Sequence, residues 1–395
     1  MTARPAIQLK PGTHRRAMSG HPWVYSNEIG MTAEAKALAP GTIVRLLAHD
    51  GRPLGTAMFN PRTLIAARLL AAAPDAVIDR DFFVHRLERA KALRDRLYGA
   101  PHYRLIHAEA DGLPGAVIDR YGDVVAMQLN SAGMDALNEA LVAALEAVLS
   151  PAAILLRNDS GARSLEGLPL ETRWLKGEAD GPTEIAENGA RFLADLGQGQ
   201  KTGWFFDQRE NRASVAALAE GHRMLDLCCY AGGFAIQAAL AGAVQTTGID
   251  RSEPALALAA RAADLNGVGK RCRFARGEVF AELERLRDGG ERFGVVVADP
   301  PAFVKSKKDV GAGSRAYRKL ARLSASVTAP GGFLFIASCS HNMEANAFAE
   351  EVRRGLQDAG RTGRILRRSG AAADHPVHPA LPESAYLKAE LLQLD

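Results

Sequence analysis

Two residues of this chain place reactive side chains directly after apolar, strand-like runs. Cys339 follows the run 332–337, and Asp299 follows the run 295–298 about forty residues earlier. The carboxyl ends of parallel strands meet at one edge of an α/β sheet, where ligands bind. We therefore expect the thiol and the carboxylate to converge on one crevice. That pair suits an enzyme that attacks a pyrimidine ring covalently.

The residues after Asp299 are Pro300-Pro301-Ala302-Phe303. Prolines fix φ and remove amide donors, so we expect a rigid rim here. An Asp-Pro-Pro or Asn-Pro-Pro followed at once by an aromatic residue is typical of methyltransferases that act on exocyclic amines. In this chain Ala302 intervenes before Phe303. Covalent ring methylation and non-covalent amine methylation therefore both remain open.

A second group of motifs opens the same predicted sheet. The expected strand 223–227 runs into the turn Asp226-Leu227-Cys228-Cys229-Tyr230-Ala231-Gly232-Gly233-Phe234, and the expected strand 245–249 is followed by Asp250. A turn of small residues lets a ligand approach a helix amino terminus, and the later acid can accept hydrogen bonds from ribose hydroxyls. This order resembles the S-adenosylmethionine pattern of class I methyltransferases, with Cys228 and Tyr230 where glycines are common. The turn lacks Gly-x-Gly-x-x-Gly, which argues against a nicotinamide-dependent oxidoreductase.

Composition sets the broad class. The 395 residues are enough for two or three domains, and 47% apolar with 24% charged residues is typical of a globular protein. No apolar run approaches the ~18 residues of a membrane span, and residues 1–10 lack the apolar core of a secretory signal. We expect a cytoplasmic protein. The four cysteines are too few and too uneven for a disulfide framework, and we expect free thiols.

Positive charge clusters after the Asp-Pro-Pro motif. The net charge is only +4, but residues 302–323 carry seven basic side chains against one acidic side chain, Asp309. This segment is either a solvated face or a surface that meets phosphates, and its place after Pro301 favours the second. The basic residues are Lys305, Lys307, Lys308, Arg315, Arg318, Lys319 and Arg322.

Sequence periodicity divides the chain into three predicted domains. Residues 1–73 form short strands with turn signals, including a hairpin at Asp50-Gly51. Residues 74–182 mix helical and strand-like patterns, with helices expected at 81–98 and 134–149, and we predict a central α+β domain. Residues 183–395 begin with a hairpin expected around Asn188-Gly189 and then alternate strands and helices, which predicts a doubly wound, mostly parallel α/β sheet of the Rossmann-like class. The helices are expected near 234–241, 254–266, 279–287, 314–329 and 345–359.

With these motifs in view, nearly the whole chain resembles the bacterial 23S rRNA cytosine-C5 methyltransferases that carry an amino-terminal PUA domain. Glu278 is a departure, because relatives more often have Asp there. The matching segments are Lys10-Pro11-Gly12, Arg15-Arg16, Gly20-His21-Pro22-Trp23-Val24-Tyr25, Phe59-Asn60-Pro61, Ile65 with Arg68-Leu69-Leu70, residues 203–212, the turn 226–234, Asp299-Pro300-Pro301, Ser338-Cys339-Ser340-His341 and Asp374-His375-Pro376.

The resemblance implies a PUA-like module for RNA docking, a 23S rRNA substrate, S-adenosylmethionine as cofactor and frequent homodimers. It implies Cys339 as nucleophile and Asp299 as the group that steadies the cytosine. We expect no metal at His375 and His378, and structural roles for Cys228, Cys229 and Cys272. The expected cofactor contacts are Gln208, Asp226, Tyr230, Gly232, Asp250, Arg251, Glu278 and Asp299.

Two alternatives remain beside this interpretation. One is a methyltransferase that modifies guanine N2 or adenine N6 in rRNA without a covalent intermediate. The other is a non-catalytic RNA-binding protein that keeps the PUA-like module. The target nucleotide, the base that removes the C5 proton and the group that activates Cys339 do not follow from the sequence.

Overall fold

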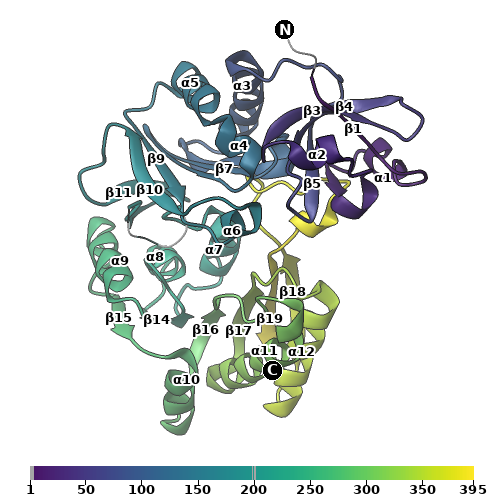
Figure 1. Cartoon of the computed structure of the whole chain (residues 1–395). Helices are drawn as coiled ribbons and strands as arrows, with labels where there is room; N and C mark the ends of the chain where they lie inside the picture. The colour runs from purple at the N-terminus through teal and green to yellow at the C-terminus, as the bar shows by residue number, and fades with distance from the viewer. Residues whose placement is uncertain (1–3, 198, 200–201) are drawn as a thin grey trace. The chain divides into compact units, whose positions relative to one another are not determined.

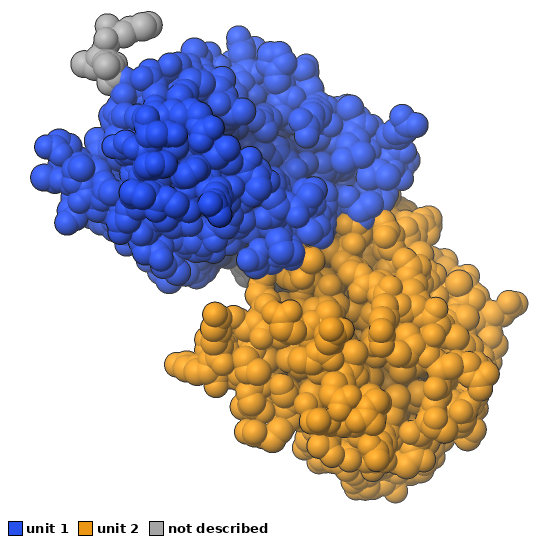
Figure 2. All heavy atoms as spheres, turned by 90° about the vertical axis from the view of Figure 1, so that its right-hand side faces the viewer, with its two compact units in different colours: residues 1–181, 195–204, 373–384 blue, residues 182–194, 205–372, 385–395 orange. Residues whose placement is uncertain are grey.

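The computed structural model describes residues 4–197, 199 and 202–395, and the chain forms two compact units (Figure 2). Unit 1 comprises residues 1–181, 195–204 and 373–384, and unit 2 comprises residues 182–194, 205–372 and 385–395. Each unit therefore includes segments that are distant in sequence. Among the described residues, no helix has both the length and the apolar character needed to cross a membrane.

Unit 1 begins with a five-stranded sheet in the order β1-β3-β4-β5-β2 (Figure 1). The predicted hairpin is confirmed, because β3 pairs antiparallel with β4. Val44, Leu46 and Phe59 are buried in the core of this sheet. Its elements are β1 (Ala6–Gln8), α1 (Arg15–Met18), β2 (Trp23–Tyr25), η1 (Ser26–Glu28), α2 (Ala33–Ala37), β3 (Thr42–Leu47), β4 (Pro53–Phe59) and β5 (Ile65–Ala71).

A second five-stranded sheet of unit 1 has the order β10-β9-β8-β7-β6, and α3 packs against α5 beside it (Figure 1). The helix predicted over 134–149 is wrong in one respect, because it is two helices that meet at Leu137. The Leu137 amide bonds to the carbonyls of both Gly133 and Met134, which tightens the turn there. The elements are α3 (Arg80–Leu97), β6 (His102–His107), η2 (Ala108–Asp111), β7 (Ala116–Tyr121), β8 (Val124–Leu129), α4 (Ala132–Ala136), α5 (Asn138–Leu149), β9 (Ala153–Asn158), α6 (Ala162–Glu166) and β10 (Glu171–Lys176).

Unit 2 contains a hairpin and a seven-stranded sheet in the order β15-β14-β13-β16-β17-β19-β18. The five strands from β15 to β17 are parallel, which confirms the doubly wound prediction, and β19 and β18 add an antiparallel edge. The strand order reverses between β13 and β16, the position where open α/β sheets bind ligands. The strands are β11 (Thr183–Glu187), β12 (Ala190–Ala194), β13 (Arg223–Leu227), β14 (Gln245–Asp250), β15 (Cys272–Arg276), β16 (Phe293–Ala298), β17 (Thr328–Ser338), β18 (Gly363–Ser369) and β19 (Lys388–Leu394).

The two faces of this sheet bury separate cores. Val296 of β16 packs in a cluster with Tyr317 and Phe348, whereas its neighbour Val295 packs in another cluster with Phe234. This alternation follows from the two-residue period of a strand. The helical elements of unit 2 are η3 (Phe206–Gln208), α7 (Arg209–Ala216), α8 (Gly233–Leu240), α9 (Glu253–Leu265), α10 (Val279–Asp288), η4 (Lys307–Asp309), α11 (Val310–Val327) and α12 (Ala345–Asp358), whereas η5 (Pro382–Ser384) belongs to unit 1.

Candidate active site

The turn between β13 and α8 has a constrained backbone. Gly232 is the N-cap of α8 with φ of 80°, and a Cβ added there would meet side-chain atoms of neighbouring residues at 3.1 Å. Cys228 and Tyr230 also have positive φ, at 60° and 48°. Residues other than glycine rarely adopt this conformation, which costs about 1–2 kcal/mol each. The two positions where glycines are common in this kind of turn thus keep a glycine-like backbone in this chain.

Asp250 lies at the end of β14, beside that turn. Its Oδ2 accepts the Tyr230 amide at 2.9 Å, and its Oδ1 accepts the Ser252 amide at 2.9 Å. These two bonds fix the carboxylate plane. A carboxylate has about four acceptor positions, so each oxygen keeps capacity for a hydroxyl donor. The orientation of the predicted acid is therefore fixed, and its contact with a ribose stays a prediction.

Two other predicted contacts pair with each other. Arg251 donates to Glu278 at 2.9 Å, and their side chains are 70% and 60% exposed. An exposed ion pair of this kind contributes little to folding stability. Both side chains remain accessible to a ligand beside β14, and their contact with a cofactor stays a prediction.

Asp226 is the buried acid of the site. Its Oδ2 accepts the Ala235 amide at 3.1 Å, while its Oδ1 is buried without a hydrogen-bond partner among the described residues. Burial raises the pKa of this carboxyl to about 8; the Ala235 hydrogen bond opposes the rise, and the charge of Asp299 adds to it. Because Asp226 is then protonated at neutral pH, the negative charge here comes from Asp299 and Asp250, which would stabilise a positively charged ligand; such a ligand would in turn lower the pKa of Asp226.

Gln208 ends η3 and is buried in unit 2. Its Oε1 accepts the Asn211 Nδ2 at 2.6 Å, and Asn211 Oδ1 accepts the Ser369 hydroxyl at 2.7 Å. Asn211 was not singled out from the sequence, although it lies in the same matched segment, 203–212. The two amides form a pair that orients Gln208, whose contact with a cofactor stays a prediction.

The Cys339 thiol lies against the Asp-Pro-Pro loop. Its Sγ is 3.9 Å from the carbonyl oxygen of Pro300, and the Asp299 amide approaches the Leu227 carbonyl at 3.4 Å. We call the turn between β13 and α8, residues 228–232, the cofactor turn. The thiol, the Asp-Pro-Pro loop and the cofactor turn therefore follow the ends of three adjacent strands: β17, β16 and β13. The structure brings Cys339 and Asp299 to one sheet edge, as expected from the sequence.

The other cysteines have environments that suppress ionisation. Burial raises the pKa of Cys228, Cys229 and Cys272, and the neighbouring Asp250 adds to this for Cys228. A thiol with a raised pKa is mostly protonated at neutral pH and is therefore a poor nucleophile.

A chain of hydroxyl groups holds the segment around Cys339. The Ser338 hydroxyl donates to the Tyr317 oxygen at 2.8 Å, and Tyr317 and Ser340 share a hydrogen bond of 2.9 Å. Ser340 Oγ also accepts the Val304 amide at 3.1 Å. All three side chains are buried. Tyr317 was missed in the sequence because it lies in the middle of α11, where a buried aromatic residue is indistinguishable from ordinary core.

Lys388 approaches the same segment from β19. It pairs with Ser338 across the sheet, and its Nζ donates to the Ser340 carbonyl at 2.6 Å. His341 stacks on Tyr386 with ring centroids 5.2 Å apart. Neither Lys388 nor Tyr386 follows from sequence reasoning, because the antiparallel strand that carries Lys388 was not expected.

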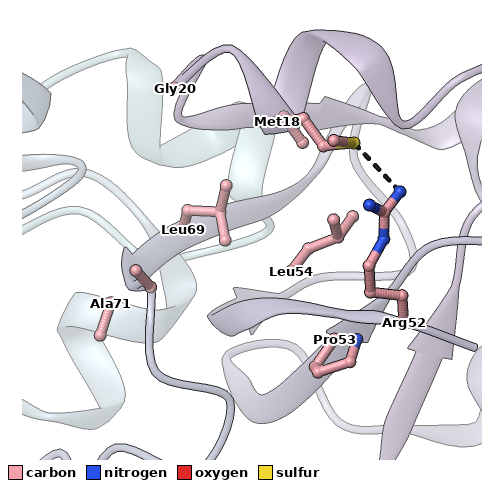
Figure 3. Close-up of a pocket in the computed structure, with 9 residues that line it drawn as sticks. Met18, Gly20, Arg52, Pro53, Leu54, Leu69 and Ala71 are labelled. Atoms are coloured by element: carbon pink, nitrogen blue, oxygen red, sulfur yellow. Dashed lines mark hydrogen bonds between the residues drawn. The ribbon is translucent and has the colours of Figure 1, made fainter.

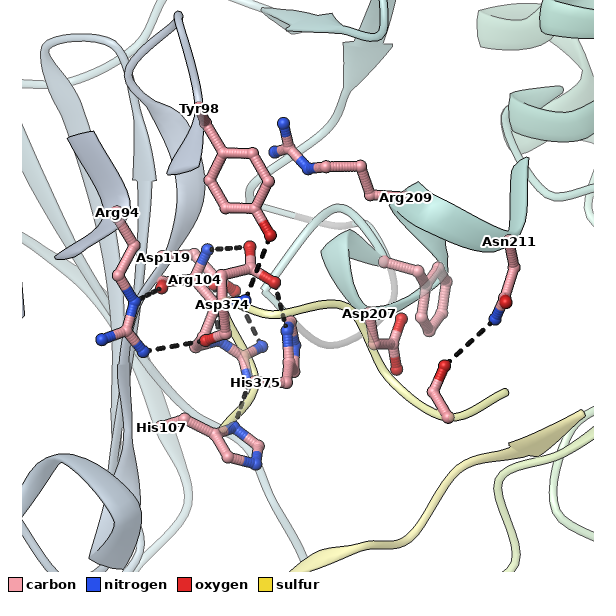
Figure 4. Close-up of polar contacts among 12 residues, drawn as sticks. Arg94, Tyr98, Arg104, His107, Asp119, Asp207, Arg209, Asn211, Asp374 and His375 are labelled. Carbon is pink, nitrogen blue, oxygen red and sulfur yellow. Dashed lines mark hydrogen bonds and ion pairs between the residues drawn. The ribbon is translucent and has the colours of Figure 1, made fainter. Parts of the chain in front are cut away.

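The Asp374-His375 segment belongs to a buried ionic network of unit 1 (Figure 4). The Asp374 carboxylate accepts the Arg104 amide at 3.0 Å and contacts His375 Nδ1 at 2.8 Å. The guanidinium of Arg94, which is fully buried, donates to the Asp374 carbonyl at 2.9 Å and to both oxygens of Asp111. Within unit 1 this network anchors residues 373–384 beside β6.

The basic segment divides into paired and unpaired charges. Arg318 pairs with Asp358 and Lys319 with Glu284. Four exposed cations at the start of the segment form no ion pair with another described residue. We call these four the basic rim: Lys305, Lys307, Lys308 and Arg315.

The amino-terminal sheet of unit 1 has a hollow of about 450 Å³ (Figure 3). Leu54 and Leu69 supply apolar walls, and the Arg52 guanidinium lies 3.4 Å from the Met18 sulfur at its margin. The hollow thus combines apolar surface with one cation.

The sequence of this chain is similar to those of known methyltransferases. Residues 159–391 match a family model described as S-adenosylmethionine-dependent methyltransferase, and residues 7–72 match a PUA-like domain. A protein named ribosomal RNA large subunit methyltransferase I from Shewanella amazonensis is 39% identical over 387 residues, covering 97% of each chain. A protein of the same name from Cronobacter sakazakii is 38% identical over 389 residues, covering 97% of each chain.

Among solved structures, SMU.776, described as a methyltransferase complexed with SAH, superposes with a TM-score of 0.84. Its sequence identity is 22%, over 98% of this chain and 100% of that one, so the likeness is one of fold. Trm5b from Pyrococcus abyssi has a TM-score of 0.53 at 15% identity, over 70% of this chain and 74% of that one.

The sheet order, the cofactor turn and Asp250 define a Rossmann-like methyltransferase domain. The chain belongs to the S-adenosylmethionine-dependent methyltransferase family and carries a PUA-like domain at its amino end. The residues present fit this cofactor. Asp250 keeps acceptor capacity that ribose hydroxyls could use, and the negative charges of Asp299 and Asp250, which raise the pKa of Asp226, favour a positively charged group beside it.

Proposed function

We propose that this protein methylates C5 of a cytosine in 23S ribosomal RNA through a covalent bond between Cys339 and the ring. The observation that carries the proposal is the 3.9 Å approach of the Cys339 thiol to Pro300 of the Asp-Pro-Pro loop. The rRNA substrate is supported by the names of relatives that are 38–39% identical over 97% of the chain, and by the PUA-like domain.

The reaction starts at Cys339. Cytosine C5 is a weak nucleophile, so the thiolate adds to C6; an S–C6 bond forms and the C5–C6 double bond opens. Its electron pair makes C5 nucleophilic. S-adenosylmethionine, when bound, supplies an electrophilic methyl group, which C5 takes. A base then removes the C5 proton, the double bond reforms, and the S–C6 bond breaks to release the Cys339 thiolate.

Asp299 stabilises the ring while charge moves. Its carboxyl group accepts a hydrogen bond from the exocyclic amine and, when it carries a proton, supplies that proton to N3 as charge develops there. The proton returns to Asp299 when Cys339 leaves. A cytosine within a helix must first leave the stack, which costs a few kcal/mol.

The competing function is methylation of an exocyclic amine, for which Asp299-Pro300-Pro301 is the supporting feature. That chemistry needs no thiol, since the amine nitrogen attacks the methyl group directly. Nucleoside analysis separates the two. Large-subunit rRNA from a strain lacking this gene is incubated with the protein and labelled S-adenosylmethionine, digested and resolved by mass spectrometry. The proposal requires that 5-methylcytidine is formed. Formation of N2-methylguanosine or N6-methyladenosine instead would refute the proposal and support the competing function.

A further inference from the structure

A lysine on the neighbouring strand hydrogen-bonds the segment that carries the proposed nucleophile. We propose that Lys388 is a positioning residue whose ammonium group keeps Cys339 in its thiolate form. The inference deepens the proposed function and rests on it for its biological meaning, but its physical content concerns only the ionisation of one thiol.

Sheet geometry brings Lys388 to Cys339. Lys388 opens β19 and pairs with Ser338, the last residue of β17, on one side of the thiol. Its Nζ donates to the carbonyl of Ser340, on the other side, at 2.6 Å. The lysine side chain therefore reaches from the residue before Cys339 to the residue after it.

Burial makes this cation effective. Lys388 is half-buried, and its pKa is lowered by desolvation, while the charges of Cys339 and Glu344 act in the opposite direction. The attraction is mutual: a thiolate that favours the ammonium form is favoured by it to the same extent. A poorly solvated ion pair is also screened less than an exposed one.

Among the described residues, Tyr317, Glu344 and Asp299 near this segment do not supply a positive charge. Tyr317, from α11, has its pKa raised by burial and is neutral at physiological pH. His341 follows in the same loop and stacks on Tyr386, and Glu344 carries a negative charge. Asp299, at the end of the neighbouring strand, would oppose thiolate formation when ionised. Lys388 is thus a cation tied to this segment from across the sheet, both by strand pairing with Ser338 and by its bond to Ser340.

The test measures the reactivity of Cys339 without RNA. The full chain is treated with iodoacetamide at pH 6 to 10, and modification of Cys339 is followed by peptide mass spectrometry. Lys388→Gln keeps a hydrogen-bond donor but removes the charge, Lys388→Met removes both, and Lys388→Arg keeps the charge. Circular dichroism and thermal unfolding establish that each variant is folded.

The inference predicts that Lys388→Gln and Lys388→Met slow alkylation about tenfold near pH 7.5, the change in thiolate fraction for one unit of thiol pKa. Lys388→Arg stays within about threefold of the wild type, since an opposite charge at this range is retained. The difference between the variants narrows as the pH approaches 10, where the thiol ionises with or without the cation. An equal loss at every pH would show that Lys388 only shapes access, and unchanged rates in Lys388→Gln would also overturn the inference.

This result is independent of the methylation chemistry. If Cys339→Ala still methylates RNA while Lys388→Gln slows alkylation, the proposed function fails and the ion pair stands. If Cys339→Ala is inactive while alkylation is unchanged in Lys388→Gln, the covalent function stands and the role of Lys388 is refuted.

Discussion

The Cys339 thiol and the Pro300 carbonyl oxygen are 3.9 Å apart, although 39 residues separate them in the sequence. The contact joins the ends of β17 and β16, which are neighbours in the sheet. The thiol thus lies against the loop that begins with Asp299. The cofactor turn follows β13, the next strand in the sheet. The proposed nucleophile and the proposed cofactor turn lie on different strands and can be changed separately.

That separation predicts the behaviour of Cys339→Ala. Methyl transfer to rRNA should fall below detection because the ring can no longer be activated, while binding of S-adenosylmethionine by calorimetry should stay within about twofold, since β13 and β14 are untouched. Cys272→Ala, at the start of β15, is the matched control and should keep its activity. Turnover in Cys339→Ala at the wild-type rate would contradict the covalent mechanism.

The backbone of the cofactor turn predicts an unusual preference for glycine. At Cys228, with φ of 60°, Cys228→Gly should be more stable than Cys228→Ala by about 1 kcal/mol, because both remove the thiol and only glycine relaxes the backbone. Urea unfolding of the two variants measures the difference.

The neighbouring Cys229 provides the control, because it is not among the residues with positive φ. There the order should reverse, with Cys229→Ala more stable than Cys229→Gly by about 0.5–1 kcal/mol. The same order at both positions would refute the assignment of strain to residue 228.

The pKa of Asp226 predicts a dependence of stability on pH. Its folded value of about 8 lies above the ordinary 3.8, so the folded state binds more protons between these values and stability falls as pH rises through this window. The slope from one such group is at most about 1.4 kcal/mol per pH unit. Asp226→Asn has no such titration and should not lose stability in this way. The thermal midpoint of Asp226→Asn should therefore rise relative to that of the wild type between pH 5.5 and pH 8.

Asp358→Asn is the comparison for that measurement. This carboxyl has a lowered pKa because of its hydrogen bond with Arg318, so its contribution to stability is complete above about pH 5. The difference between the thermal midpoints of Asp358→Asn and the wild type should stay constant from pH 5.5 to pH 8. A flat difference for Asp226→Asn as well would contradict the raised pKa.

The basic rim predicts part of the salt dependence of RNA binding. Lys307→Gln with Lys308→Gln removes two exposed cations, and the slope of log Kd against log salt should fall by about 0.7–0.9 for each phosphate that the rim no longer neutralises. Filter binding of rRNA fragments at several salt concentrations gives the slope. Arg353→Gln with Arg354→Gln removes the same charge from α12, where both arginines pair with Glu350, and should leave the slope unchanged. Equal slopes in the two double variants would exclude the rim from RNA binding.

Sequence reasoning succeeds here where local patterns determine structure. The Asn188-Gly189 pair predicts the hairpin of β11 and β12, and both residues adopt the positive φ that such a turn needs. Strand β13 begins and ends as predicted, since a short buried run is bounded by turn residues on both sides. Local periodicity also predicts each helix from α8 to α12, with boundaries within a few residues.

The start of α11 shows where local patterns fail. Gly311 and Gly313 lower the helical propensity of the first turn, so periodicity predicts a start at Ser314. The helix in fact begins at Val310. Gly313 is required there by packing, since a Cβ would meet Val304 at 2.3 Å. A tertiary contact thus overrides propensity.

Lys388 and Tyr317 show the same limit within the site. Each meets the Cys339 segment through packing of elements that are distant in sequence, and neither residue stands in a recognisable motif. Sequence motifs predict the candidate catalytic residues. The residues that contact the Cys339 segment depend instead on the pairing of β17 with β19 and on the burial of α11, which motifs do not show.

The most direct test of the covalent mechanism is to trap the adduct. The protein is incubated with S-adenosylmethionine and an rRNA fragment in which 5-fluorocytosine replaces cytosine, so that C5 has no proton to lose and the enzyme cannot leave C6. The mechanism predicts a denaturation-resistant protein–RNA complex whose peptide mass places the bond on Cys339. A complex through Cys228, Cys229 or Cys272, or methylation of unmodified RNA without any trapped species, would contradict it.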